Sequence, residues 1–194
     1  GPIVRYADIE PQLKERRSTP DMIAAGAQRF VLGLAKKVLI ANVLYQLITV
    51  YKSTTQPSVL YSWMYAAAYM LHIYFDFSGY SDMAIGLGKI FGFHFAENFN
   101  YPYISRSATE FWRRWHMSLG SWFRDYVYIP MGGNRVAPAR RYFNILVVWV
   151  LTGLWHGADW NFVLWGLFFA VFLIMEKGFL LKPLQKLPVL SHLY

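Results

Sequence analysis

The chain has 194 residues, of which 56% are hydrophobic, 19% aromatic and only 15% charged, and its mean hydropathy is +0.25. This composition is too apolar for an ordinary water-soluble domain and indicates a membrane protein. The formal net charge of +8 suits anionic lipid headgroups or a phosphorylated ligand. The aromatic residues lie in apolar runs and do not alternate with basic residues, which disfavours nucleic-acid binding, and the absence of cysteine excludes disulfides and thiolate chemistry.

The first 21 residues are polar and contain three prolines, so we interpret residues 1–21 as a membrane-surface segment. No signal-peptide pattern follows Gly1, and we therefore expect the chain to be a fragment of a longer protein. Residues 22–93 are predicted to form membrane helices. In their first part, 22–51, polar and basic residues interrupt the helical pattern, which indicates a span partly buried in protein.

Residues 59–75 are nearly uncharged, and a helix needs roughly 20 residues to cross the hydrocarbon core. This credible span runs into DFSGYSDMAIGLGKIFGF, whose glycines permit either close helix packing or a break. Its polar residues could bind a cation, relay protons, or tie two helices together by hydrogen bonds. We favour the tie, and keep Asp76 and Ser78 as candidate substrate-binding residues.

Residues 94–141 form the one long polar stretch after the first segment, and all of the basic residues in it are arginines. Aromatic residues are spaced between them at helical intervals, as in Phe111, Trp115 and Trp122. A helix with one apolar face and one cationic face would suit an interfacial or re-entrant position. The MGGN sequence at 131–134 predicts a turn.

Two apolar runs, 142–155 and 160–176, are separated only by HGAD, and residues 142–180 would be membrane helices. The runs are either two short spans joined at HGAD or one helix pair with its polar joint inside the membrane. An ionisable side chain in hydrocarbon costs at least ~2.5 kcal/mol for Asp and persists only where something compensates it. We predict that Asp159 caps the helix starting at Trp160. For His156 we favour a functional role, because a neutral imidazole can remove a proton near pH 7.

His116 lies in an arginine- and tryptophan-rich segment that we expect to be more wettable than the run holding His156. The tryptophans around it could still bury it beside a site, where it would contact substrate. His72 and His94 are interpreted as packing or interfacial residues. No metal site is expected, because no short spacing of ligands typical of zinc occurs.

Four long motifs are similar to those of a known family. They are GPIVRY at 1–6, YFDFSGYSDMAIGLGKIFGF at 74–93, the NFNYPYISR to GGNR stretch at 98–135, and LTGLWHGADWNFVLWG at 151–166. With them the chain resembles the membrane-bound O-acyltransferase (MBOAT) family, in its bacterial branch that modifies alginate, peptidoglycan and teichoic acid. The resemblance implies an all-α, polytopic membrane enzyme of which residues 1–194 are one core fragment.

The resemblance also implies a site and a reaction. His156 matches the histidine of the family's WHG motif, and His116 matches a second family histidine. An acyl thioester at the cytoplasmic face of a bacterial inner membrane, such as acetyl-CoA, would be the donor. The acyl group would reach an extracytoplasmic polysaccharide acceptor, with the help of a separate acceptor or acyl-relay protein.

The residue chemistry agrees with acyl transfer. His156 would act as base, and Trp155, Trp160, Asn161 or His116 would donate a hydrogen bond to the oxyanion. No Ser or Cys stands beside His156, which argues against a covalent acyl-enzyme, and we expect no bound cofactor. Arg113, Arg114 and Arg124 could hold donor phosphates or anchor lipid phosphate.

Two other classes of protein remain open from the residues. In a transporter or channel, His156, Asp76 and Asp82 would form a pathway for protons or substrate. In a haem-binding electron carrier, His72 and His156 would be axial ligands.

Overall fold

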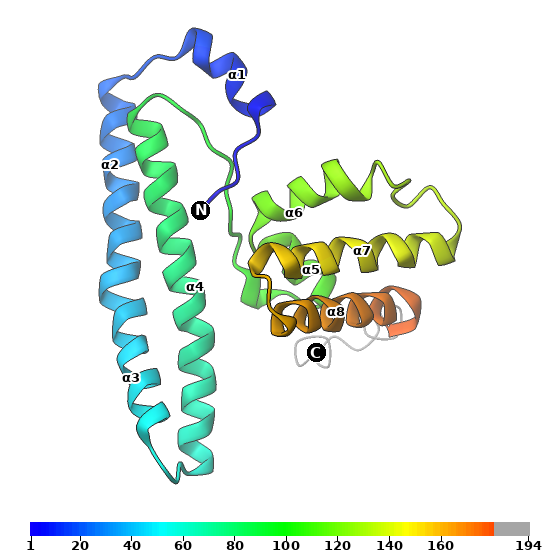
Figure 1. Ribbon diagram of the computed structural model, residues 1–194. Coiled ribbons are helices and arrows are strands. Elements are labelled where there is room, and N and C mark those ends of the chain that lie inside the picture. Colours follow the sequence, from blue (N-terminus) through cyan, green and yellow to red (C-terminus); the bar gives the residue numbers. More distant parts are fainter. Residues whose placement is uncertain (181–194) are drawn as a thin grey trace. The chain divides into compact units, whose positions relative to one another are not determined.

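The computed structural model describes residues 1–180, and every regular element in that range is a helix. The all-α prediction is confirmed for these residues. The chain divides into two compact units, Gly1–Asn98 and a second that begins at Phe99. Figure 1 shows the elements of each unit, which we describe in turn.

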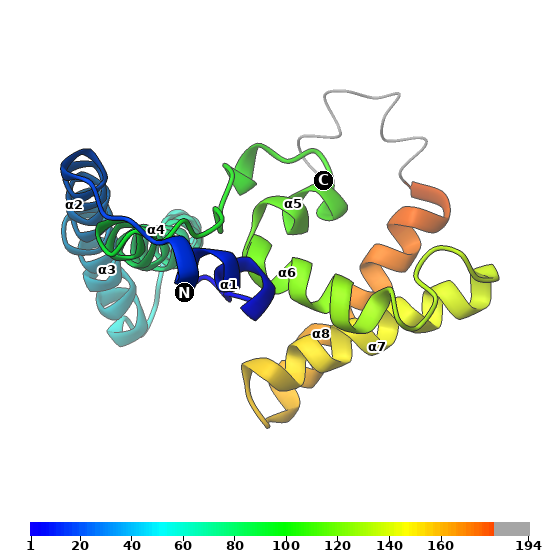
Figure 2. The same cartoon turned by 90° about the horizontal axis from the view of Figure 1, so that it is seen from above.

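The first unit is built on two long antiparallel helical rods. After α1 (Tyr6–Glu15), the first rod runs without a break through α2 (Pro20–Ala35), the π-helical turn η1 (Lys36–Ala41) and α3 (Asn42–Ser53). The second rod is α4 (Val59–Ile90), which lies along α2 and α3 (Figures 1 and 2). A hydroxyl caps the start of each rod: Thr19 Oγ1 accepts from the Met22 amide at 3.3 Å and Ser58 Oγ from the Tyr61 amide at 3.2 Å.

Reciprocal glycine pairs bring α2 and α4 into backbone contact. A Cβ added at Gly33 would lie 2.6 Å from the Gly79 carbonyl oxygen, and one added at Gly26 would lie 2.6 Å from that of Gly86. Gly26 and Gly33 are two helical turns apart on α2, and Gly79 and Gly86 are two helical turns apart on α4. Each helix therefore has both of its glycines on one face. The sequence left packing or a break open for these glycines, and the structure has close packing within an unbroken α4.

The second unit contains η2 (Pro102–Ile104), α5 (Ala108–Arg114), α6 (Met117–Phe123), η3 (Arg124–Tyr128), α7 (Pro138–His156), α8 (Trp160–Met175) and η4 (Glu176–Leu180). Helices α7 and α8 form an antiparallel pair, side by side in Figures 1 and 2. Gly153 and Gly166 allow this approach, because a Cβ at either would lie within 2.4 Å of a carbonyl oxygen of the other helix. The two apolar runs around HGAD therefore form a helix pair.

The prediction of a single amphipathic helix within residues 94–141 is wrong. The chain leaves the helical conformation at Trp115 and His116, and His116 has a left-handed backbone with φ of 46°. Phe111 and Trp115 still stack, with ring centroids 5.6 Å apart, but Trp122 belongs to the next helix. The MGGN turn is present, with positive φ at Gly132 and Gly133.

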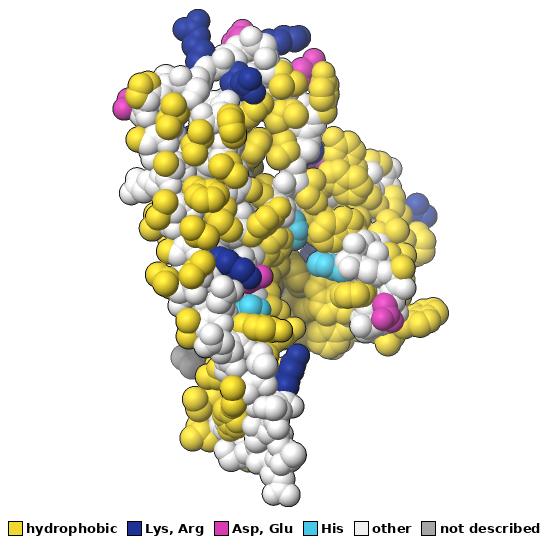
Figure 3. All heavy atoms as spheres, turned by 60° about the vertical axis from the view of Figure 1, so that its left-hand side comes forward, with side chains coloured by type: hydrophobic (Ala, Val, Ile, Leu, Met, Phe, Trp, Pro, Cys, Tyr) yellow, Lys and Arg dark blue, Asp and Glu magenta, His cyan; other side chains and the backbone are white. Residues whose placement is uncertain are grey.

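Two continuous helices in the described residues are long and apolar enough to cross a membrane. They are Pro20–Ser53, of 34 residues, and Trp160–Leu180, of 21 residues. The span predicted at 59–75 lies inside α4, which is long enough but is not one of these two. Figure 3 shows hydrophobic side chains spread over much of the face in view, with a group of charged side chains at the top and isolated ones elsewhere.

Candidate functional site

His156 lies where α7 ends. Gly157 has an extended backbone, with φ of 169° and ψ of 150°, and α8 starts three residues later. The imidazole is exposed and is surrounded by aromatic rings of both helices. Its ring centroid lies 5.0 Å from that of Trp155, 5.1 Å from that of Trp165 and 6.2 Å from that of Phe162.

Asp159 occupies the N-cap position of α8, as predicted, but its side chain does not cap the helix. The Asp159 backbone carbonyl accepts from the Phe162 amide at 3.1 Å. With its amide oriented to satisfy both groups, Asn161 donates to the Asp159 carboxylate at 2.6 and 3.1 Å. The side-chain cap was therefore a wrong prediction, because Asn161 engages the carboxylate.

His116 is brought to the same cluster from the α5–α6 junction. Its ring lies edge-on to Trp155, with centroids 5.8 Å apart, and Ser118 Oγ lies 3.5 Å from its Nδ1. Burial lowers the pKa of His116, and nearby His156 lowers that pKa further. The sequence led us to expect that His116 would be more accessible to solvent than His156. The structure shows the reverse, because His116 is 5% exposed whereas His156 is exposed.

An aromatic cluster fixes α5 against the helix pair. The ring centroid of Trp112 lies 4.8 Å from that of Trp149, 5.7 Å from that of Trp165 and 4.9 Å from that of Phe169, and each pair is packed edge to face. Since Trp165 also contacts His156, the packing of α5 and the position of the histidine are linked.

Glu176 holds the other end of α5, and sequence reasoning missed it. Its side chain is fully buried, and its carboxylate accepts the Ala108 amide at 2.8 Å and the Thr109 amide at 3.0 Å. These are the first amides of α5, which have no partner within their own helix. The available signal was a carboxylate at the end of an apolar run, where a charge needs compensation.

The three candidate phosphate-binding arginines differ in their surroundings. Arg114 binds Glu110, with Nη2 2.9 Å from Oε1, and Arg124 binds Asp125, with Nε 2.6 Å from Oδ1. Arg113 is exposed and makes no hydrogen bond or ion pair with any residue in the described part of the chain. Of the three, only Arg113 has no acidic partner among the described residues.

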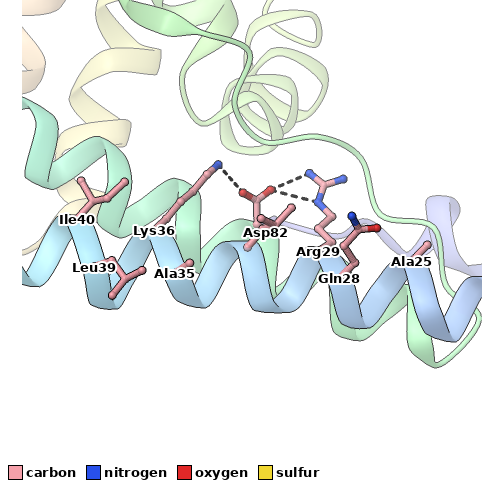
Figure 4. Close-up of a pocket in the computed structure, with 9 residues that line it drawn as sticks. Ala25, Gln28, Arg29, Ala35, Lys36, Leu39, Ile40 and Asp82 are labelled. Atoms are coloured by element: carbon pink, nitrogen blue, oxygen red, sulfur yellow. Dashed lines mark hydrogen bonds and ion pairs between the residues drawn. The ribbon is translucent and has the colours of Figure 1, made fainter.

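The candidates Asp76 and Ser78 belong to the first unit, where the acidic residues tie the rods together. Asp76 pairs with Lys37, and Asp82 lies between Arg29 at 2.9 Å and Lys36 at 2.6 Å (Figure 4). The favoured interpretation of DFSGYSD as a helix tie is confirmed for both carboxylates. Ser78 Oγ is buried without a partner.

The same network lines an open groove of about 630 Å³ on α2, η1 and α4. Of its charged groups, Asp82 pairs with both Arg29 and Lys36, and Arg29 also pairs with Glu97, so these charges are compensated within the protein. Elsewhere in this unit, His72 Nδ1 lies 2.9 Å from the Ala41 carbonyl oxygen and its ring packs on Tyr45, which confirms it as a packing residue.

Comparison with known proteins identifies the family. The family model described as MBOAT, membrane-bound O-acyltransferase family, matches residues 1–187. The chain belongs to this family. Among MBOAT relatives, the probable alginate O-acetylase AlgI of Azotobacter vinelandii is 48% identical over 92% of this chain, and that of Pseudomonas aeruginosa is also 48% identical over 92%. The peptidoglycan O-acetyltransferase of Helicobacter pylori is 40% identical over 92% of the chain.

The chain spans about a third of these MBOAT relatives, which is 36%, 34% and 35% of their respective lengths. A teichoic acid D-alanyltransferase of Bacillus subtilis is 31% identical over 92% of the chain, which covers 48% of that protein. The resemblance expected from the motifs is thus confirmed.

Proposed function

We propose that the complete protein is a membrane-bound O-acyltransferase in which His156 is the general base. The observation that carries this proposal is the meeting of an exposed His156, at the break between α7 and α8, with a buried His116 across Trp155. An exposed imidazole can reach a substrate hydroxyl, and its apolar walls limit competing contact with water.

In the proposed reaction, neutral His156 takes the proton of the acceptor hydroxyl as its oxygen bonds to the thioester carbonyl carbon. The carbon–sulfur bond then breaks, and the thiolate leaves with the proton returned by the imidazolium. A positioned base contributes about 10²–10⁴-fold to such a step. His116, kept neutral by burial, and Trp155 are placed to orient the base or to donate a hydrogen bond to the oxyanion.

For the substrates, we propose an acetyl thioester such as acetyl-CoA as donor and a cell-envelope or extracellular polysaccharide as acceptor. The support is that the relatives are named for acetylation of alginate and peptidoglycan. Transfer to the far side of a bacterial inner membrane, through an acceptor or relay protein, completes this proposal. The transport alternative gains no support from Asp76 and Asp82, because both are engaged in ion pairs.

The test compares two histidine variants of the complete enzyme. His156→Ala should lower acyl transfer at least ~10²-fold while membrane insertion stays normal, because a base contributes that much. His116→Asn should lower turnover less, since Asn tolerates the left-handed backbone and the base remains. Radiolabelled acetyl transfer to isolated polysaccharide is the measurement. Near-wild-type transfer by His156→Ala would disprove the role of His156.

A further inference from the structure

Three cationic side chains of the second unit converge at the end of α8. Arg113 comes from α5, Arg141 from the first turns of α7 and Lys177 from η4. Lys177 is close enough to Arg113 and Arg141 for their like charges to act on it, and close enough to Glu176 for attraction. Contacts of the neighbouring residues place these elements together: Glu176 accepts the first amides of α5, and a Cβ added at Gly178 would lie 3.7 Å from the Tyr142 hydroxyl of α7.

No acid of the described residues forms an ion pair with this cluster. Among residues 1–180, none of the ion pairs within 4 Å includes Arg113, Arg141 or Lys177. Glu176 attracts Lys177, but its oxygens accept the amides that begin α5. By contrast, Arg114 and Arg124 each bind an acidic neighbour.

Arg141 supplies a second and independent observation. Its Nε is buried and has no hydrogen-bond acceptor. A buried donor without an acceptor is costly, and a guanidinium is most stable when it faces the paired oxygens of a carboxylate or a phosphate. An anion at this point would complete the hydrogen bonding of Arg141 and relieve the repulsion among the three cations.

We propose that Arg113, Arg141 and Lys177 form a binding site for a phosphate group. Phosphate suits these residues, because a guanidinium binds paired phosphate oxygens in a bidentate manner and a lysine adds a compact positive charge. Two molecules can bring this chemistry to a membrane enzyme, namely an anionic phospholipid headgroup and a phosphorylated thioester donor.

The donor alternative rests on the proposed function and has a geometric basis. Arg141 lies near the start of α7 and His156 at its end, so along the axis they are about 22 Å apart at ~1.5 Å per residue. A donor with its phosphate at the cluster would need a long flexible arm to present a thioester to His156, and phosphopantetheinyl thioesters carry such an arm.

The key variant is Arg141→Gln in the complete protein, with Arg140→Gln as matched control. Arg140 is the adjacent residue of equal charge. Both guanidinium groups lie over a neighbouring ring, Arg140 over Phe143 at 5.2 Å and Arg141 over Tyr142 at 5.3 Å, but only Arg141 has a buried Nε without an acceptor. Arg113→Gln, at an exposed position, serves as second variant where Arg141→Gln does not fold.

Two measurements separate the sources of phosphate. If the donor supplies it, Arg141→Gln raises the KM for acetyl-CoA about tenfold, equivalent to ~1.4 kcal/mol, and leaves the KM for phosphate-free acetyl-pantetheine unchanged. If a lipid supplies it, native mass spectrometry finds fewer bound phosphatidylglycerol molecules on Arg141→Gln than on Arg140→Gln. The lipid measurement needs no activity, so it stands even where the proposed function fails. The phosphate site is disproved if Arg141→Gln and Arg113→Gln both match Arg140→Gln in both measurements.

Discussion

At the scale of single residues, the two histidines of the site have opposite environments. His116 sits at a junction of two short helices and is covered by Trp155, whereas His156 ends its helix with an exposed ring. The left-handed conformation of His116 is uncommon for a non-glycine residue and turns the chain sharply between α5 and α6. The buried histidine is thus the one in the arginine-rich segment.

Burial of His116 predicts acid destabilisation. Its pKa is lowered in the folded protein, so folding favours the neutral form. This contribution to stability is fully present above about pH 6.5, the usual pKa of histidine, and is lost as pH falls towards the lowered value. His116→Asn should therefore flatten the fall in unfolding temperature below about pH 6.5. The exposed His94→Asn variant is the control, and the same pH dependence in His116→Asn and wild type would contradict this origin.

At the scale of elements, α5 depends on a residue far away in sequence. A helix of seven residues is too short to be stable alone, and Glu176 provides acceptors for its first amides. The charge of Glu176 is in turn tolerated in a buried position because those amides and the positive end of the helix face it.

We predict that Glu176→Ala lowers the free energy of unfolding by about 1–3 kcal/mol, because two partly buried amides lose their acceptor. Glu110→Ala, on the same helix, is the control. It removes a partly exposed pair with Arg114 and should cost about 0–1 kcal/mol. Thermal unfolding in detergent is the measurement, and equal losses would show that the Glu176 contacts do not stabilise α5.

The close contact between α2 and α4 leads to a second prediction at the scale of elements. Gly33→Ala should destabilise the protein although alanine favours helices, because the added Cβ would clash with the Gly79 carbonyl oxygen at 2.6 Å. Gly120→Ala is the matched control, since its Cβ would meet nothing nearer than 3.7 Å. Protease resistance in detergent compares the two variants, and an unharmed Gly33→Ala would argue against close packing of these rods.

At the scale of the whole molecule, the prediction concerns the membrane. The described chain lacks cysteine, so single cysteines can report on exposure to water without competing thiols in this region. Cysteine at Val43, an exposed position of the Pro20–Ser53 helix, should resist a water-soluble maleimide in intact membranes. Cysteine at Lys14, on α1, should react readily. Equal labelling rates in membranes, with both sites reactive in denaturant, would place Val43 in water.

The sequence alone determined the all-helical class, the two apolar helical runs around HGAD, the MGGN turn and the family. These features follow from long apolar runs, from glycine and proline residues that end helices or form turns, and from specific motifs, all of which are local in the chain. Local patterns likewise marked His156, because a lone imidazole between apolar runs stands out. The roles of its neighbours could not be predicted in the same way.

Only the tertiary structure decided which polar groups meet. Glu176 caps α5 from 67 residues away, Arg113 lacks a partner while Arg114 has one, and His116 is buried against Trp155. Hydrogen bonds and ion pairs depend on distances of a few ångströms between segments remote in sequence, and no periodicity encodes those distances. The apolar pattern therefore specifies the helices, and their packing specifies the electrostatics of the site.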